Sequence, residues 1–195
     1  MKRFTKAALG GIATCGLILG ATQAASGVSP HVVGGWSGEL RDLRPEVTGG
    51  PLDGASASLR IVESADEGTG FRLRITGINT AVAAPEFGAH LHLGLCTART
   101  VVTTEPLVLS PDTTSGHYKA DPSGPADPSN EVWFDLAPDE EGVANDETWV
   151  PFVPVDNNPP GMSIVIHQHE AALPTSASPK EACLPVNVAS WLQPV

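Results

Sequence analysis

The alternation of apolar and polar residues in Phe71-Arg72-Leu73-Arg74-Ile75-Thr76 is the feature that most restricts the fold of this chain. A period of two is typical of a β-strand with one face buried and the other in water. The turn-forming segment 65–70 precedes this run, and the apolar run 59–62 precedes the turn. The sequence therefore predicts a β-hairpin in which one face packs against a core.

Further short segments have the composition of strands, and no stretch has a convincing helical period. The expected strands are 89–95, 101–109, 131–136, 148–153 and 163–167. The long connections 121–128 and 156–161 are rich in proline, which is typical of loops. Many short strands without helices predict an all-β fold, an antiparallel sandwich or Greek-key β-barrel of immunoglobulin-like character.

The N-terminal segment has the features of a secretory signal peptide. A basic start is followed by the nearly apolar stretch 7–20 and by small residues at Thr22 and Ala24. We expect residues 1–24 to be a signal, too short to span a membrane, with cleavage after Ala24. Residues 25–55, rich in Gly, Pro and Ser, are expected to be an N-terminal extension or first irregular strand. Residues 56–195 are expected to form the β domain.

A lipid anchor at Cys15 is an alternative to simple secretion. The residue before it, Thr14, is larger than a bacterial lipobox favours, and the apolar stretch 16–19 follows where lipoproteins usually carry a polar linker. The secreted or extracytoplasmic form without an anchor is therefore the favoured interpretation.

Two cysteines, Cys96 and Cys183, lie beyond the predicted signal. An even count in an oxidising compartment predicts a single disulfide, and two unpaired buried thiols are the disfavoured alternative. The bond would close a loop of 87 residues.

The charge of the predicted mature chain is strongly negative. Eight basic and 22 acidic residues lie after position 24, a net charge of −14. Such a surface argues against nucleic acid and anionic lipid as partners, and it repels small anions outside any local positive patch. The sequence predicts no particular oligomeric state.

Five of the six histidines gather in three places. His90 and His92 lie two residues apart in the expected strand 89–95, His117 follows Ser115-Gly116, and His167 and His169 end the β-branched run 163–167. Residues two apart on a strand share a face. The pattern therefore predicts a metal centre built across a sheet, with neutral imidazoles as ligands.

The chain resembles the copper/zinc superoxide dismutase family through an ordered set of short segments. These are, in order, Gly88-Ala89-His90-Leu91-His92, Cys96, Gly116-His117-Tyr118, Val165-Ile166-His167 and Ala182-Cys183. The resemblance runs from about Ala57 to Val188. It implies the family's Greek-key β-barrel or sandwich, and it implies dismutation of superoxide to oxygen and hydrogen peroxide.

The resemblance also implies roles for individual residues. His90, His92, His117 and His167 match the copper ligands, and His117 matches the ligand that bridges copper to zinc. Cys96 and Cys183 match the intrasubunit disulfide. Lys180 falls where the family places the arginine that guides superoxide, so the resemblance makes His117 and Lys180 the expected catalytic residues.

The remaining zinc ligands of the family have no match here. No histidine lies between His117 and His167, and the carboxylates Asp121, Asp127 and Asp135 are a poor substitute. We therefore expect one copper and no zinc, as in the copper-only branch of the family. Without zinc, a carbonyl, carboxylate or water must hold the second ring nitrogen of His117.

Two histidines have no match in the family pattern. His169 is interpreted as a solvated residue at a strand end, with a role as an additional ligand as the alternative. The same interpretation applies to His31, near the expected start of the mature chain.

Two other functions stay open at this point. One is a secreted copper-binding or structural domain that keeps the fold but has little or no turnover. The other is a cupin-like mononuclear metal enzyme, because Gly-x-His-x-His also opens cupin sites. A cupin normally adds a glutamate shortly after the histidine pair, and here the next acid is Glu105. The cupin alternative is therefore disfavoured.

Overall fold

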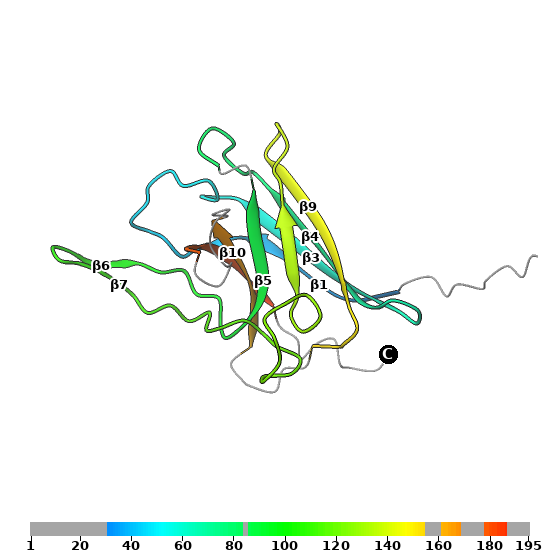
Figure 1. The fold of residues 1–195 in the computed structure, drawn as a ribbon. Helices are drawn as coiled ribbons and strands as arrows, with labels where there is room; N and C mark the ends of the chain where they lie inside the picture. Colours follow the sequence, from blue (N-terminus) through cyan, green and yellow to red (C-terminus); the bar gives the residue numbers. More distant parts are fainter. Residues whose placement is uncertain (1–30, 84–85, 155–160, 169–177, 187–195) are drawn as a thin grey trace, which may run out of the picture.

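The structure, a computed structural model, describes residues 31–83, 86–154, 161–168 and 178–186. The predicted signal peptide, Cys15 and His169 lie outside these residues, as does the side chain of His31. The described chain is all-β without a helix, as the sequence predicted, and two antiparallel sheets contribute side chains to one core (Figure 1). Accordingly, the described residues include no helix that could cross a membrane.

The first sheet has four antiparallel strands in the order β1-β3-β4-β9. They are β1 (His31–Glu39), β3 (Ser56–Ser64), β4 (Gly68–Thr76) and β9 (Val143–Val150). The predicted hairpin is confirmed as β3 and β4, with Leu59 opposite Leu73. Phe71, Leu73 and Ile75 point into the core, and Arg72 and Arg74 are exposed.

The second sheet has five antiparallel strands in the order β2-β11-β10-β5-β8. They are β2 (Arg41–Asp42), β11 (Lys180–Val186), β10 (Met162–Gln168), β5 (Phe87–Leu93) and β8 (Trp133–Leu136). A separate two-stranded ribbon, β6 (Val101–Thr104) and β7 (Leu107–Leu109), projects away from both sheets (Figure 1).

The central strands of the second sheet are buried on both faces. Phe87, Ala89 and Leu91 of β5, with Met162, Ile164 and Ile166 of β10, belong to the main core. The residues between them are also buried, although His90, His92, Ser163 and His167 are polar. The polar face of this sheet therefore lies beneath a further layer of chain, which is where the candidate site forms.

Three segments differ from the strand prediction. Segment 25–55 contributes β1 and β2, which pair with β3 and β11, so the chain belongs to the sheets from residue 31. Segment 101–109 forms two strands instead of one, since Glu105-Pro106 forms the turn and proline has no N–H for a ladder. Strand β9 begins at Val143, earlier than expected, directly after the turn in which Gly142 N donates to Asp139 O.

Strand β11 was not predicted at all. Its sequence, Lys180-Glu181-Ala182-Cys183-Leu184-Pro185-Val186, lacks a period of two. The strand nevertheless pairs with β10 on one side and with β2 on the other. Its position between β10 and β2, rather than its own pattern, determines its conformation.

The predicted disulfide between Cys96 and Cys183 is confirmed, with a Cα–Cα distance of 5.7 Å. It joins the loop after β5 to β11 and lies in a small apolar cluster with Leu43 and Val165. The Arg41 guanidinium donates a hydrogen bond to the carbonyl of Cys96. The disulfide thus fixes the chain that leaves the histidine-bearing strand.

We expect the purified, denatured but unreduced mature protein to contain no titratable thiol. Replacing both cysteines by serine should lower the free energy of unfolding by about 4 kcal/mol, because the bond closes a long loop in the unfolded chain. Thiol titration and urea unfolding measure the two effects. Two reactive thiols in the unreduced protein would contradict the assignment.

Candidate metal centre

Strands β5 and β10 bring three of the four predicted ligands onto one face of the second sheet. Alternation on β5 sends His90 and His92 to the face opposite Ala89 and Leu91. On the neighbouring strand, His167 lies opposite Gly88, one diagonal step from His90.

The fourth predicted ligand, His117, comes from a loop that lies along β5. Gly116 O accepts a hydrogen bond from Leu93 N at 3.0 Å, and Tyr118 N donates to Leu91 O at 2.8 Å. These backbone contacts place His117 opposite His92 in an isolated antiparallel β-bridge. Gly94, with a φ of 95°, makes this approach feasible, because a Cβ there would collide with the carbonyl oxygen of Thr113.

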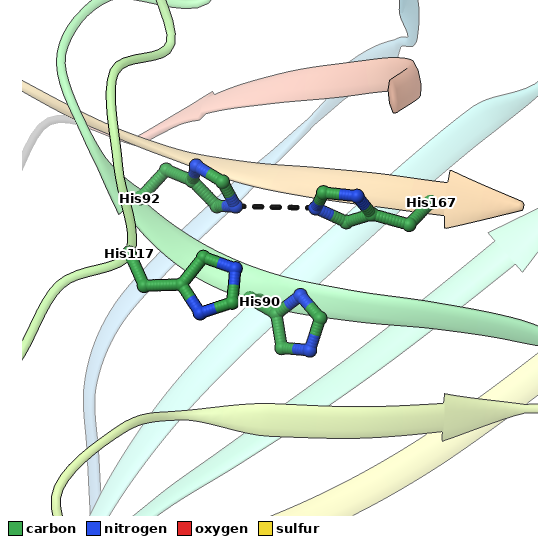
Figure 2. Close-up of side chains that lie close together, drawn as sticks. All are labelled: His90, His92, His117 and His167. Atoms are coloured by element: carbon green, nitrogen blue, oxygen red, sulfur yellow. Dashed lines mark hydrogen bonds between the residues drawn. The ribbon is translucent and has the colours of Figure 1, made fainter. Parts of the chain in front are cut away.

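The four predicted ligands lie together in one group. One ligand atom from each of His90, His92, His117 and His167 lies within 4.8 Å of the others (Figure 2). It is the single group of three or more metal-binding side chains found in the described part of the chain. His90, His92 and His167 are at most 2% exposed. Such a buried group could hold a metal ion.

The hydrogen bonds of His92 and His167 leave two unprotonated nitrogens facing each other. Nδ1 of His92 donates to Ser115 O, and Nδ1 of His167 donates to Ser178 O, each at 3.1 Å. In the neutral rings each Nε2 then carries a lone pair, and the two Nε2 atoms are 3.2 Å apart (Figure 2). Two facing lone pairs repel each other, so a cation bound between these two Nε2 atoms would be favourable.

His90 adds a further donor atom. Its Nδ1 is buried and has no hydrogen-bond partner among the residues that the structure describes. The ring stacks on His117, with a centroid distance of 4.3 Å, and meets the edge of Trp133 at 5.3 Å. Leaving a buried ring nitrogen unpaired costs free energy, which coordination to a metal would recover.

Glu131 holds the second ring nitrogen of His117. Nδ1 of His117 donates to Oε2 of Glu131 at 2.7 Å, and Nε1 of Trp133 donates to the same oxygen at 2.8 Å. The carboxylate is 1% exposed, and Nζ of Lys119 lies 4.0 Å from Oε1. A carboxylate on the far nitrogen fixes the ring and makes Nε2 a better ligand.

The sequence analysis predicted that a carbonyl, carboxylate or water holds this nitrogen, but it did not identify Glu131. Glu131 was assigned only to an expected strand. The available signal was an isolated acid beside the apolar run Val132-Trp133-Phe134. The distant pairing of this segment with the loop at His117 could not be read from either segment alone.

Burial keeps His90, His92 and His167 neutral in the metal-free protein. It lowers the pKa of His90 to about 2, with the nearby His117 as the next cause. The same two effects lower the pKa of His92 to about 3. Burial is also the main cause at His167, where the pKa falls to about 4. Neutral imidazole is the form that binds a metal.

The carboxylates considered as substitute zinc ligands are not in the histidine group. Asp121 accepts hydrogen bonds from Ser123, and Asp127 accepts them from Ser129, each within its own turn. Asp135 is exposed on β8.

Lys180 lies beside the group, opposite His167 on β11, but its charge is paired. Nζ donates to Asp112 Oδ2 at 2.8 Å, Thr114 Oγ1 at 2.9 Å and Ser115 O at 3.0 Å. Burial alone would raise the pKa of Asp112, but hydrogen bonds from Lys180 and Thr114 lower it to about 2. Lys180 therefore also fastens the segment whose Ser115 orients His92. The position of Asp112 beside Lys180 could not be predicted from the sequence.

Comparison with protein-family models and with curated proteins finds no match.

The metal-free protein should lose stability on mild acidification. Unfolded histidines bind protons below about pH 6.5, whereas the folded rings do so only near pH 2 to 4. The unfolded state then binds more protons, so the unfolding free energy falls with falling pH, by at most about 1.4 kcal/mol per unit for each ring. Urea midpoints at pH 7, 6 and 5 measure this.

In a matched variant, His90→Phe, the unfolding free energy should depend less steeply on pH, because one titrating ring is replaced by an apolar one. A midpoint that stays level from pH 7 to 5 in the unmodified protein would show that the rings are not held neutral by burial.

Replacing Glu131 by Gln should weaken metal binding by roughly tenfold or more, because the amide keeps the shape but loses the charge that polarises His117. Competition with a chelator of known affinity measures the change. Asp135→Asn, at an exposed carboxylate, is the control and should bind as the unmodified protein does. Equal affinities in both variants would exclude the role given to Glu131.

Proposed function

We propose that this protein is a secreted, copper-dependent superoxide dismutase that resembles the copper-only branch of the copper/zinc family. The supporting observation is the buried group of His90, His92, His117 and His167, in which a carboxylate rather than a second metal holds His117. In this proposal the two sheets form the Greek-key fold of superoxide dismutase type. The disulfide is compatible with export.

The donor set favours copper. All four donors are nitrogens of imidazole rings, which suit both oxidation states of copper, and copper lies at the top of the affinity order for such sites. A bound copper would supply a one-electron couple for converting two superoxide ions and two protons to oxygen and hydrogen peroxide.

The protein's own residues would position that couple and the proton. The carbonyls of Ser115 and Ser178 direct Nε2 of His92 and of His167 into the group. Glu131 keeps the Nδ1 proton of His117, so Nε2 is the atom of this ring that can bind metal or hold a proton for the substrate. Together with Lys180 as the anion guide, His117 is the proposed catalytic residue.

A second candidate is a copper-binding domain of the same fold with little turnover. The observation that favours it is the ion pair between Lys180 and Asp112. A guide cation neutralised by a neighbouring carboxylate attracts an anion less strongly, and the rest of the chain is acidic.

The test is metal analysis and a superoxide assay on protein loaded with copper, zinc or both. We expect about one copper per chain, no stoichiometric zinc, and activity only with copper. His92→Gln should lose both copper and activity, and Asp135→Asn should keep both. Tightly held zinc beside copper would contradict the copper-only assignment, and bound copper without activity would establish the second candidate.

Lys180 and Asp112 should have opposite effects on the encounter with superoxide. Lys180→Glu should lower the second-order rate constant by roughly tenfold at low salt, and Lys180→Arg should hold or raise it. Asp112→Asn should raise it several-fold, since it frees the positive charge. Stopped-flow decay of superoxide at increasing ionic strength measures these effects.

Screening of charges by added salt should lower the second-order rate constant of the unmodified enzyme and of Asp112→Asn. The rate constant of Lys180→Glu should stay the same or rise. Copper content, measured in parallel, should be unchanged. If all four proteins had the same rate constant and the same salt dependence, Lys180 would have no role in attracting superoxide. Its role would then be only to hold the segment that contains Ser115.

A further inference from the structure

The outer face of the first sheet carries a groove lined by arginines. This face lies on the side of the molecule away from the histidine group, with the core between them (Figure 1). Arg60 of β3 and Arg72 and Arg74 of β4 are exposed there. They line a groove of about 620 Å³, within the range of about 300–1,000 Å³ that is usual for small-molecule sites.

The arrangement of these arginines is unfavourable for the isolated sheet. The register of the β3–β4 hairpin places Arg60 directly opposite Arg72, and like charges in this position destabilise a sheet. Three of the eight basic residues of the described chain thus gather on one face of a protein that is otherwise strongly acidic. A local arrangement that lowers stability is expected at functional surfaces.

Arg60 is available for a ligand. Arg72 pairs with Glu147 of β9, Nε to Oε2 at 2.9 Å, and Arg74 donates to the amide oxygen of Asn145 at 3.0 Å. Arg60 makes no hydrogen bond or ion pair with any residue that the structure describes, whereas each of the other seven basic side chains makes at least one. Its guanidinium can therefore bind a carboxylate in the bidentate manner without giving up a bond.

The indole of Trp149 lies beside the arginines. A Cβ on Gly70 would lie 2.8 Å from atoms of this ring, so the glycine lets the indole approach the backbone of β4. Nε1 of Trp149 donates to Oε1 of Glu147 at 2.9 Å, which fixes the ring from a second side. The ring remains partly exposed. Gly70, Arg72 and Arg74 follow one another on one face of β4, over about 13 Å of strand.

This combination favours an acidic carbohydrate over a nucleic acid. The C–H face of a sugar ring packs well on an indole, and a sugar carboxylate suits a free guanidinium. Sugar hydroxyls can both donate to Glu147 and accept from Arg74. A phosphodiester chain has few hydroxyl donors, and the carboxylates of Asp146 and Glu147, which also line the groove, would repel it.

We propose that this face binds an acidic polysaccharide, a chain of sugar rings that carry carboxylates. Trp149 stacks on one ring, and Arg60 binds the carboxylate of another. The site goes beyond the proposed superoxide chemistry and does not depend on it. It would attach the protein to a carboxylated glycan, with the face that carries the histidine group turned away from the glycan.

The experiment is isothermal titration calorimetry of the purified protein with oligomers of galacturonate, mannuronate and glucuronate at low salt. The unmodified protein should bind at least one of them. The same oligomer with its carboxylates reduced to alcohols should bind roughly tenfold more weakly or worse, because the charge-assisted bonds to Arg60 are lost. Added salt should weaken the binding of the acidic form.

Two variants test the residues. Arg60→Gln should weaken binding by roughly tenfold or more and should also raise the urea midpoint of unfolding, because the repulsion from Arg72 is removed. Trp149→Leu should weaken binding several-fold and abolish the change in tryptophan fluorescence on binding. Arg99→Gln makes the same change of charge at the ribbon of β6 and β7, and as the control it should bind as the unmodified protein does.

Four results would overturn the proposal. They are no binding to any of the three acidic oligomers, equal affinity for the reduced oligomer, equal affinity of Arg60→Gln and Arg99→Gln, and tighter binding of a single-stranded oligonucleotide with the same number of charges. The last result would assign the groove to nucleic acid instead.

Discussion

The strict alternation of side chains along β5 is the constraint on which the site depends. One set of residues, including Ala89 and Leu91, packs into the core between the sheets, and the other set, His90 and His92, faces the opposite side. A shift of register by one residue would exchange the two sets, at the cost of burying imidazoles in the core and exposing aliphatic side chains. Core packing therefore also fixes the direction of the histidines.

Around this strand, the rings of His92, His117 and His167 are each positioned by a hydrogen bond from the nitrogen that faces away from the group. Two backbone carbonyls and the carboxylate of Glu131 fill these places. The arrangement leaves lone pairs pointing inward, and burial keeps His90, His92 and His167 neutral. The same features that would be unfavourable in a metal-free core are those that a metal site requires.

The fold class and the histidine group could be predicted from the sequence, because both depend on local periodicity and on residue type. The β3–β4 hairpin and the clustering of His90, His92, His117 and His167 agree with that prediction. Strand β11, Glu131 and Asp112 could not be predicted, because pairing between distant segments places them. Nothing in the residues adjoining Asp112 indicates that it reaches Lys180, 68 residues away.

The proposed function requires that the four histidines together bind copper. Electron paramagnetic resonance of the protein loaded with about one Cu(II) per chain tests it most directly. We expect a single copper species with hyperfine coupling to imidazole nitrogens, and its spectrum should change when either His90 or His167 is replaced by alanine. A spectrum of oxygen-coordinated copper that is the same in both variants would contradict it.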